Sequence, residues 1–246
     1  MSPDEIREQA RYYASLGYRA YKMRCGGDPD QTGDRLSIDR DRIAAAREAL
    51  GMDRLLFVDV AIPQRPTAWD EGRVEAYMDI CEPMKVRFIE EPAMTYDVNR
   101  YRALQRMNRV PVAGGESFSC PEEFEPFFET RALDVAQPDA AVVGGPASCF
   151  DVCSRAHDLG LDICLHCWAA GVGIAQNLHA ACAAPGGVLA MEGSQVSHAL
   201  AQEPLDDIWK FQNGFLTPPE KPGLGVSISE DFLAKYPFQH GTERNY

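Results

Sequence analysis

A series of acidic and imidazole side chains recurs along the chain, each at the end of a short apolar run. The members of the series are Asp59, Glu90, Glu116, Asp139, His166 and Glu192. From Glu90 onward the steps are 26, 23, 27 and 26 residues, which suits one strand, one helix and two loops. In a parallel barrel the carboxyl ends of all strands meet on one face, where barrel active sites lie. The spacing therefore predicts a metal or acid/base site on that face.

The segments around these residues predict strands that alternate with helices. Ser2, Pro3 and Glu5 have the chemistry of a helix start. Helices are expected at residues 3–16, 38–50, 72–81, 121–130, 147–159 and 173–184. Strands are expected at residues 18–24, 55–60, 86–90, 110–116, 133–139, 162–166 and 188–192. This alternation indicates parallel strands with right-handed crossovers, but it yields seven strands where a closed barrel has eight, which leaves two edges to be covered.

The composition is that of a globular protein with one barrel-sized domain: 246 residues, 45% hydrophobic and 25% charged. The net charge of −13 argues against nucleic acid as a partner, because nucleic-acid binding needs a basic surface. The sequence shows neither an apolar stretch of membrane-spanning length nor a signal-peptide pattern at its start. We therefore expect no membrane partner and a cytoplasmic location.

Eight cysteines stand at irregular positions in the chain. Several lie within apolar patterns, among them Cys81, Cys153, Cys164 and Cys182, which indicates small buried hydrophobic residues in a reducing compartment. Cys164 and Cys167 form a CxxC motif, but no second pair stands at zinc-finger spacing. Packing is therefore favoured over a zinc or redox role.

Five motifs together resemble the mandelate racemase branch of the enolase superfamily. They are FIEEP at 88–92, GGES at 114–117, QPDAAVVGG at 137–145, LHCW at 165–168 and PGLGVSI at 222–228. The resemblance implies an α/β fold, a TIM-like (β/α)7β barrel with one Mg²⁺ ion and a separate α+β capping domain. It assigns residues 1–221 to the barrel and residues 222–246 to a tail that packs towards the capping domain.

The first barrel strand and most of the capping domain of that family have no counterpart in this sequence. If Met1 is the true start, we expect a second polypeptide to supply them. This chain would then be the barrel subunit of a heteromeric enzyme, and the protein would be an oligomer.

Three carboxylates match the metal ligands of the family: Asp59, Glu90 and Glu116. Mg²⁺ prefers oxygen donors and keeps positions open for substrate oxygens, which three converging carboxylates can provide. A single acid at a strand end more often caps the next helix, but three in phase favour a metal site. Glu91 is expected to support the ligands from behind or to face solvent, because neighbours on a strand point to opposite faces.

Asp139 and His166 match the base dyad of the family. A carboxylate that bonds one ring nitrogen fixes the tautomer and raises the basicity of the other nitrogen. A lone histidine at a strand end is more often structural, but the acid one strand earlier favours catalysis. The remaining histidines are assigned no role: His157, His179, His198 and His240.

Lys22 and Arg24 lie where the family has a Lys-x-Lys pair, and both are expected to face the barrel interior. A guanidinium is a poor general base but a good carboxylate clamp, so Arg24 argues against two-base racemisation. Glu192 matches a carboxylate that hydrogen-bonds the substrate carboxylate, although an acid that merely pairs with a neighbouring base would look the same. Ala61 replaces an asparagine that helps many relatives to hold substrate or metal.

The predicted function is a Mg²⁺-dependent dehydration of an acid sugar, in which His166 removes the proton α to the carboxylate. Lys22 would orient the substrate carboxylate, and Arg24 would stabilise charge. A racemase or epimerase is the alternative within the same mechanistic class. A non-catalytic structural or regulatory barrel is the alternative of another class.

Overall fold

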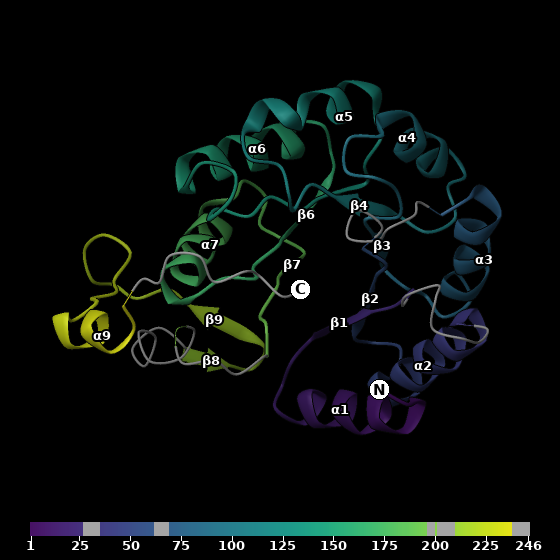
Figure 1. Cartoon of the computed structure of the whole chain (residues 1–246), viewed down its shortest axis with the longest axis horizontal. Coiled ribbons are helices and arrows are strands. Elements are labelled where there is room, and N and C mark those ends of the chain that lie inside the picture. The colour runs from purple at the N-terminus through teal and green to yellow at the C-terminus, as the bar shows by residue number, and fades with distance from the viewer. Residues whose placement is uncertain (27–34, 62–68, 196–199, 201–209, 238–246) are drawn as a thin grey trace.

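The computed structural model describes residues 1–26, 35–61, 69–195, 200 and 210–237. Figure 1 shows strands inside a ring of helices. The barrel strands are β1 (Ala20–Arg24), β2 (Leu55–Asp59), β3 (Phe88–Glu90), β4 (Val112–Gly114), β5 (Val135–Ala136), β6 (Asp162–Leu165) and β7 (Ala190–Met191). The helices are α1 (Pro3–Ser15), α2 (Arg35–Leu50), α3 (Glu71–Cys81), α4 (Val98–Arg106), η2 (Pro121–Glu123), α5 (Glu125–Thr130), α6 (Pro146–Asp158) and α7 (Gly171–Ala183).

The seven strands form one parallel sheet in the order β1-β2-β3-β4-β5-β6-β7. The predicted TIM-like α/β barrel is therefore confirmed, and the described residues contain no capping domain. Within this part of the chain β1 and β7 do not pair with each other. The ring of strands is nearly closed, with an opening between its first and last members.

An apolar layer fills the barrel interior below the predicted site. It consists of Phe57, Phe88, Ala113, Val135 and Cys164. The rings of Phe57 and Phe88 stack with their centres 4.2 Å apart. Because side chains two residues apart on a strand share a face, the acids that follow on β2 and β3 point into the same interior, one layer higher.

Most cysteines are buried and free, as predicted. Six of the eight are buried, and Cys164 and Cys167 are both unpaired thiols. Cys182 is exposed, so the prediction of a buried residue is wrong there. Ala180 and Ala184 are buried, whereas the helical turn carries Cys182, between them, to the outside.

A buried carboxylate fixes the loop that follows β1. Asp39 on α2 is fully buried and accepts hydrogen bonds from the backbone N–H of Gly26 at 2.6 Å and the Tyr77 hydroxyl at 2.6 Å. It also pairs with Arg42 at 2.5 Å, and Arg42 donates to the carbonyl of Arg24 at 3.1 Å. The carboxyl end of β1 is thereby tied to two helices.

Helix α4 is absent from the predicted elements. Asp97 caps its start by accepting from the N–H of Arg100 at 3.0 Å, and Tyr101 and Leu104 are its buried face. The acidic cap and the three-residue apolar spacing are helix signals that could have identified it. Because the helix has only nine residues, the helical periodicity of its apolar residues is weak in the sequence.

An antiparallel hairpin and a short helix follow the barrel, and neither is predicted. They are β8 (Lys210–Gln212), β9 (Phe215–Thr217) and α9 (Glu230–Lys235). Asn213 and Gly214 form the turn with φ of 54° and 84°. Asn-Gly is a strong hairpin signal because both residues tolerate positive φ, so the sequence did carry this information.

The hairpin bridges the two sides of the opening in the helix ring, where Figure 1 shows it between α7 and α1. On one side Phe211 stacks on Tyr18 with ring centres 4.2 Å apart, and Arg19 lies over the Phe215 ring. On the other side Leu216 packs against the apolar face of α7. Residues just before β1 are thus joined to α7 through the hairpin.

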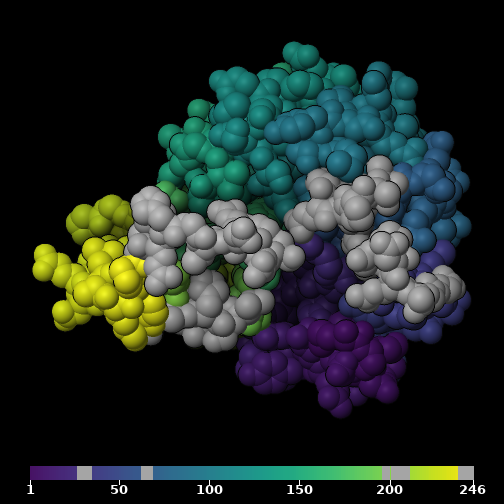
Figure 2. Space-filling view, in the orientation of Figure 1, coloured from purple at the N-terminus to yellow at the C-terminus, as the bar shows by residue number. Residues whose placement is uncertain are grey.

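The chain after the hairpin also lies against α7. Leu224 and Val226 pack on the same apolar cluster, and the carbonyl of Leu224 bonds the His179 ring at 3.2 Å. Figure 2 shows α9 projecting from the body of the molecule, and Leu233 on this helix is 58% exposed. Packing of the tail towards a capping domain stays a prediction.

None of the helices in the described part of the chain combines the length and the apolar character that a membrane crossing requires.

We expect Gly214→Ala to destabilise the protein more than Gly223→Ala. Both glycines have positive φ, so both substitutions carry about 1–3 kcal/mol of backbone strain. Only at Gly214 would the new methyl group clash, because it would lie 2.7 Å from the carbonyl oxygen of Gly17 and 2.5 Å from Cγ of Arg19. Urea unfolding should show an additional loss of about 1–3 kcal/mol.

Gly223→Ala is the matched control because nothing lies within 4 Å of the new methyl group. Hydrogen exchange at the amides of β8 and β9 should rise in Gly214→Ala alone. Equal unfolding free energies for the two variants would contradict the contact between hairpin and β1.

Candidate active site

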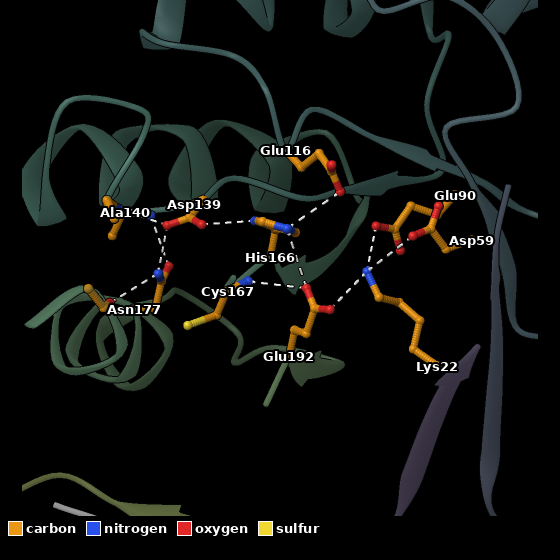
Figure 3. Close-up of polar contacts among 12 residues, drawn as sticks. Lys22, Asp59, Glu90, Glu116, Asp139, Ala140, His166, Cys167, Asn177 and Glu192 are labelled. Carbon is orange, nitrogen blue, oxygen red and sulfur yellow. Dashed lines mark hydrogen bonds and ion pairs between the residues drawn. The ribbon is translucent and has the colours of Figure 1, made fainter. Parts of the chain in front are cut away.

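The predicted site residues lie together at the carboxyl ends of the strands. In the parallel register Arg24 pairs with Asp59, and Asp59 pairs with Glu90. Glu116, Asp139, His166 and Glu192 follow the ends of β4, β5, β6 and β7. In Figure 3 Lys22 and all of these residues except Arg24 belong to one connected set of polar contacts. Arg24 joins the set through its ion pair with Asp59. The regular spacing in the sequence therefore corresponds to one site in space.

Lys22 is the centre of one half of the site. Its ammonium lies 2.6 Å from Glu90, 3.2 Å from Glu192 and 4.0 Å from Asp59. Burial disfavours the charged ammonium, but the three carboxylates outweigh burial and hold the pKa of Lys22 well above its usual value. Lys22 is thus a fixed positive charge inside the barrel, facing inward as predicted.

Glu90 is the most buried of the three acids predicted to bind metal, with no exposed surface. Burial raises its pKa, but Lys22 reverses that effect and brings the pKa to about 2. The pKa of Asp59 rises to about 6, because burial and the charge of Glu90 exceed the effect of Lys22 and Arg24. The pKa of Glu116 rises to about 9, mainly through burial. These acids share a space that contains too little positive charge for all of them to ionise easily.

The donor set fits a hard cation, although the acids are not assembled around one point. In the described residues no group of three or more His, Cys, Asp or Glu side chains is close enough to hold a metal ion. Asp59 Oδ1 and Glu90 Oε2 are buried and make no hydrogen bond within the described structure. Unpartnered carboxylate oxygens in a buried site are chemically suited to bind a cation, and oxygen is the donor that Mg²⁺ prefers.

Glu91 is buried, with 2% of its surface exposed, so the alternative that it faces solvent is wrong. Its backbone has φ of 48°, a conformation uncommon outside glycine, which turns the chain sharply after β3. Burial and the charges of Asp59 and Glu90 raise the pKa of Glu91 to about 8. The departure from strand geometry breaks the alternation on which the prediction relied.

Asp139 and His166 are in direct contact. His166 Nδ1 lies 2.8 Å from Asp139 Oδ2, and because a carboxylate can only accept, Nδ1 carries the hydrogen. Burial lowers the pKa of His166, but Asp139, Glu192 and Glu116 outweigh it and raise the pKa above its usual value. Nε2 points to the rest of the site, 3.6 Å from Glu116 and 3.6 Å from Glu192.

Glu192 connects the two halves of the site. Its Oε1 lies 3.2 Å from the Lys22 ammonium, whereas its Oε2 lies 3.6 Å from His166 Nε2 and accepts from the N–H of Cys167 at 3.3 Å. The simpler interpretation, an acid that pairs with a nearby base, therefore describes what is seen. The same position also lets Glu192 face a group bound between Lys22 and His166.

Arg24 lies at the rim of the site, with 53% of its side chain exposed. Its Nε lies 2.9 Å from Asp59 Oδ2, so the guanidinium binds an acid of the protein in this structure. Ala61 is buried with φ of 43°, and the residues 62–68 that follow lie outside the described part of the chain.

The other histidines lie away from these contacts or outside the described residues. His179 bonds the carbonyl of Leu224, and His157 packs against Gly186, so both serve local packing. His198 and His240 fall outside the described residues.

One residue of the site was missed by the sequence reasoning. Asn177 on α7 is fully buried and donates to Asp139 Oδ1 at 2.7 Å. The signal was an amide among the apolar residues on the inner face of this helix, where it is costly unless it bonds another polar group.

Comparison with known proteins agrees with this geometry. Residues 5–232 match the family model described as enolase C-terminal domain-like. Arabinonate dehydratase of Saccharolobus solfataricus is 27% identical over 237 residues, which is 95% of this chain and 59% of that protein.

Two solved structures show the same barrel. The 3,6-anhydro-D-galactonate cycloisomerase of Zobellia galactanivorans has a TM-score of 0.83 and 28% identity, covering 95% of this chain and 63% of that one. L-talarate dehydratase of Polaromonas sp. JS666, solved with Mg and L-glucarate, has a TM-score of 0.78 and 28% identity, covering 95% and 60%.

The chain thus spans about 60% of the length of these relatives. The match over residues 5–232 includes all seven barrel strands, and four of the five motifs of the mandelate racemase branch lie at the ends of these strands. The chain therefore belongs to the enolase C-terminal domain-like family, of which it contains the barrel portion.

Proposed function

We propose that this barrel catalyses the removal of water from an acid sugar by proton abstraction next to the carboxylate. The observation that carries the proposal is the contact between His166 and Asp139, which directs Nε2 to the face that also carries Lys22 and the strand-end acids. A substrate carboxylate would be attracted to the cationic groups, and the adjacent C–H bond would face the imidazole. Similarity to dehydratases of arabinonate and of L-talarate supports the same reaction.

In the proposed reaction His166 Nε2 takes the hydrogen from the carbon α to the carboxylate, and the electron pair of that bond forms the new double bond. The hydroxide on the β carbon leaves and receives a proton, from the imidazolium or another acid, to become water. Asp139 accepts from Nδ1 throughout, which stabilises the imidazolium. Lys22 and Arg24 compensate the charge that grows on the substrate carboxylate.

Asp59, Glu90 and Glu116 would hold a Mg²⁺ ion in the active enzyme. When bound, Mg²⁺ supplies positive charge that stabilises an ionised carboxylate and lowers the cost of removing the α proton. Support comes from the two unpartnered carboxylate oxygens and from the acids' adjacent strand positions. In this structure the Lys22 ammonium compensates part of the negative charge of the acids. Lys22 would therefore have to move away from Glu90 when the cation binds.

A non-catalytic barrel is a second candidate, favoured by one observation. The Lys22 ammonium already occupies the space among Glu90, Glu192 and Asp59, and the described acids are not preassembled as a metal cluster. A lysine that permanently neutralises these acids would leave a structural or regulatory subunit. A racemase or epimerase has less support, because Arg24 stands at the position of the second base in the related racemases, and a guanidinium is a poor general base.

We further propose that a second polypeptide pairs with the open edges of β1 and β7 and covers the site, so that the enzyme is a heteromer. Support comes from the opening between β1 and β7 in the described structure. Apolar side chains are also exposed in the loops that follow β3, β5 and β6. They are Met94, Tyr96, Val142 and Trp168, between 41% and 63% exposed.

We expect titration calorimetry to show one Mg²⁺ site that Glu90→Gln weakens by at least about 100-fold. Loss of a mere supporting partner already costs about 10- to 100-fold in affinity, and a ligand should cost more. Lys22→Met should bind Mg²⁺ more tightly than the wild type, because no ammonium then competes for Glu90. Glu82→Gln is the control, since Glu82 is exposed and pairs with Arg109 on the outside. Absence of Mg²⁺ uptake, with or without a co-expressed partner, would favour the non-catalytic barrel.

We expect His166→Asn to abolish exchange of the α hydrogen with solvent when arabinonate and glucarate are incubated in D₂O. Removal of a general base lowers the rate by about 10²–10⁴-fold. His157→Asn is the matched control, because that histidine lies on α6 away from the site. Exchange that survives in His166→Asn would refute its role. Exchange without loss of water would assign the barrel to epimerisation instead.

Native mass spectrometry of the protein from its source organism is expected to show this 27.2 kDa chain together with a second, smaller chain. The open edges of β1 and β7 would be paired in that complex. A homo-oligomer without another chain would contradict the heteromeric arrangement.

A further inference from the structure

Helix α7 carries one fully buried polar side chain, Asn177. Its neighbours on the inner face are Ile174, Ala175 and Leu178, which are apolar and buried. A buried amide destabilises a protein by about 1–3 kcal/mol when it lacks hydrogen bonds. The position of Asn177 therefore depends on the bonds that it makes.

Each end of the Asn177 amide bonds a different group. Its Oδ1 accepts from the backbone N–H of Ala140 at 2.8 Å, and its Nδ2 donates to the carbonyl of Gly173 at 3.2 Å. Because a backbone N–H can only donate and a carbonyl can only accept, these two contacts fix which end is oxygen and which is nitrogen. The second hydrogen of Nδ2 then points at Asp139 Oδ1, 2.7 Å away.

The bonds of Asp139 divide between its two oxygens. Oδ1 accepts from Asn177 and from the N–H of Ala141 at 2.8 Å. Oδ2 is left for His166 Nδ1 at 2.8 Å, as Figure 3 shows. Two donors on Oδ1 hold the plane of the carboxylate, so that Oδ2 faces the imidazole. The orientation of His166 is therefore set from α7, outside the barrel strands.

We propose that Asn177 is a positioning residue that holds Asp139 in place and thereby keeps His166 in the tautomer with hydrogen on Nδ1. Nε2 then remains the unprotonated nitrogen of the neutral ring and faces Glu116 and Glu192. The catalytic consequence of this arrangement rests on the proposed function, whereas the tautomer itself does not.

The test uses the full-length chain labelled with ¹⁵N-histidine, at a pH where the imidazole is neutral. NMR should show a single His166 tautomer with Nδ1 protonated in the wild type and a mixture of two tautomers in Asn177→Leu. Leucine has nearly the shape of asparagine but no donor for Asp139. Asn177→Ser serves as the second variant if the leucine variant does not fold, because its hydroxyl is too short to reach Asp139.

Tyr77→Phe is the matched control. This substitution also removes one buried hydrogen bond, the one from the Tyr77 hydroxyl to Asp39. Neither Tyr77 nor Asp39 contacts Asp139 or His166 in the hydrogen bonds of the described residues. Tyr77→Phe should lose stability like the Asn177 variants and keep the wild-type His166 tautomer. A folded Asn177 variant that retains the single wild-type tautomer would overturn the proposal.

Kinetics separate this proposal from the proposed function. With arabinonate, Asn177→Leu should lower kcat by about 10- to 100-fold and leave KM nearly unchanged, since the side chain touches His166 only through Asp139. An active wild type with unchanged kcat in Asn177→Leu would overturn the positioning role alone. A tautomer shift in a protein whose wild type is inactive would support the positioning of His166 and refute the dehydratase instead.

Discussion

Buried negative charge at one end of the barrel is the constraint on which the rest of the site depends. Five acids at that end have 8% or less of their surface exposed: Asp59, Glu90, Glu91, Glu116 and Asp139. Ionised acids in such surroundings are costly unless cations or hydrogen-bond donors face them. Lys22 and Arg24 compensate part of the charge, and the opposite shifts in the pKa of Glu90 and Glu116 show that compensation is uneven. This imbalance is the physical argument for a further cation.

The fold concentrates this charge without exposing the apolar core to it. Phe57 and Phe88 stack one layer below Asp59 and Glu90 on the same strands. The lower layer stabilises the barrel through apolar burial, whereas the upper layer is reserved for polar chemistry. Asp39, outside the barrel, ties the end of β1 to the helices by three buried bonds. Stability and chemistry thus depend on different residues.

Much of the arrangement could be predicted from the sequence because it follows from regular spacing. Strand ends that recur once per strand and helix must share one end of a parallel barrel, so the common face of these side chains was predictable. The pairing of His166 with Asp139 came from the family resemblance. The burial of Glu91 was not predictable, because it depends on a positive φ, and glutamate is not a residue type that indicates positive φ. Asn177 was missed because its importance comes from a partner 38 residues away.

Electrostatic detail was equally beyond sequence reasoning. Spacing placed Lys22 inside the barrel, but only the register shows its ammonium among Glu90, Glu192 and Asp59. The hairpin at Asn213 and Gly214, in contrast, could have been predicted, because its Asn-Gly turn signal is present in the sequence. Its contact with Tyr18 joins segments almost 200 residues apart, which no local pattern encodes.

Helix α7 contacts two distant parts of the chain. It bonds Asp139 through Asn177, and it receives the segment around Leu224 through His179 and the apolar cluster that includes Ile174 and Leu178. A helix moves as a nearly rigid rod, so a displacement at one contact is carried to the other. The segment around Leu224 and the acid/base pair are therefore linked mechanically through a single helix.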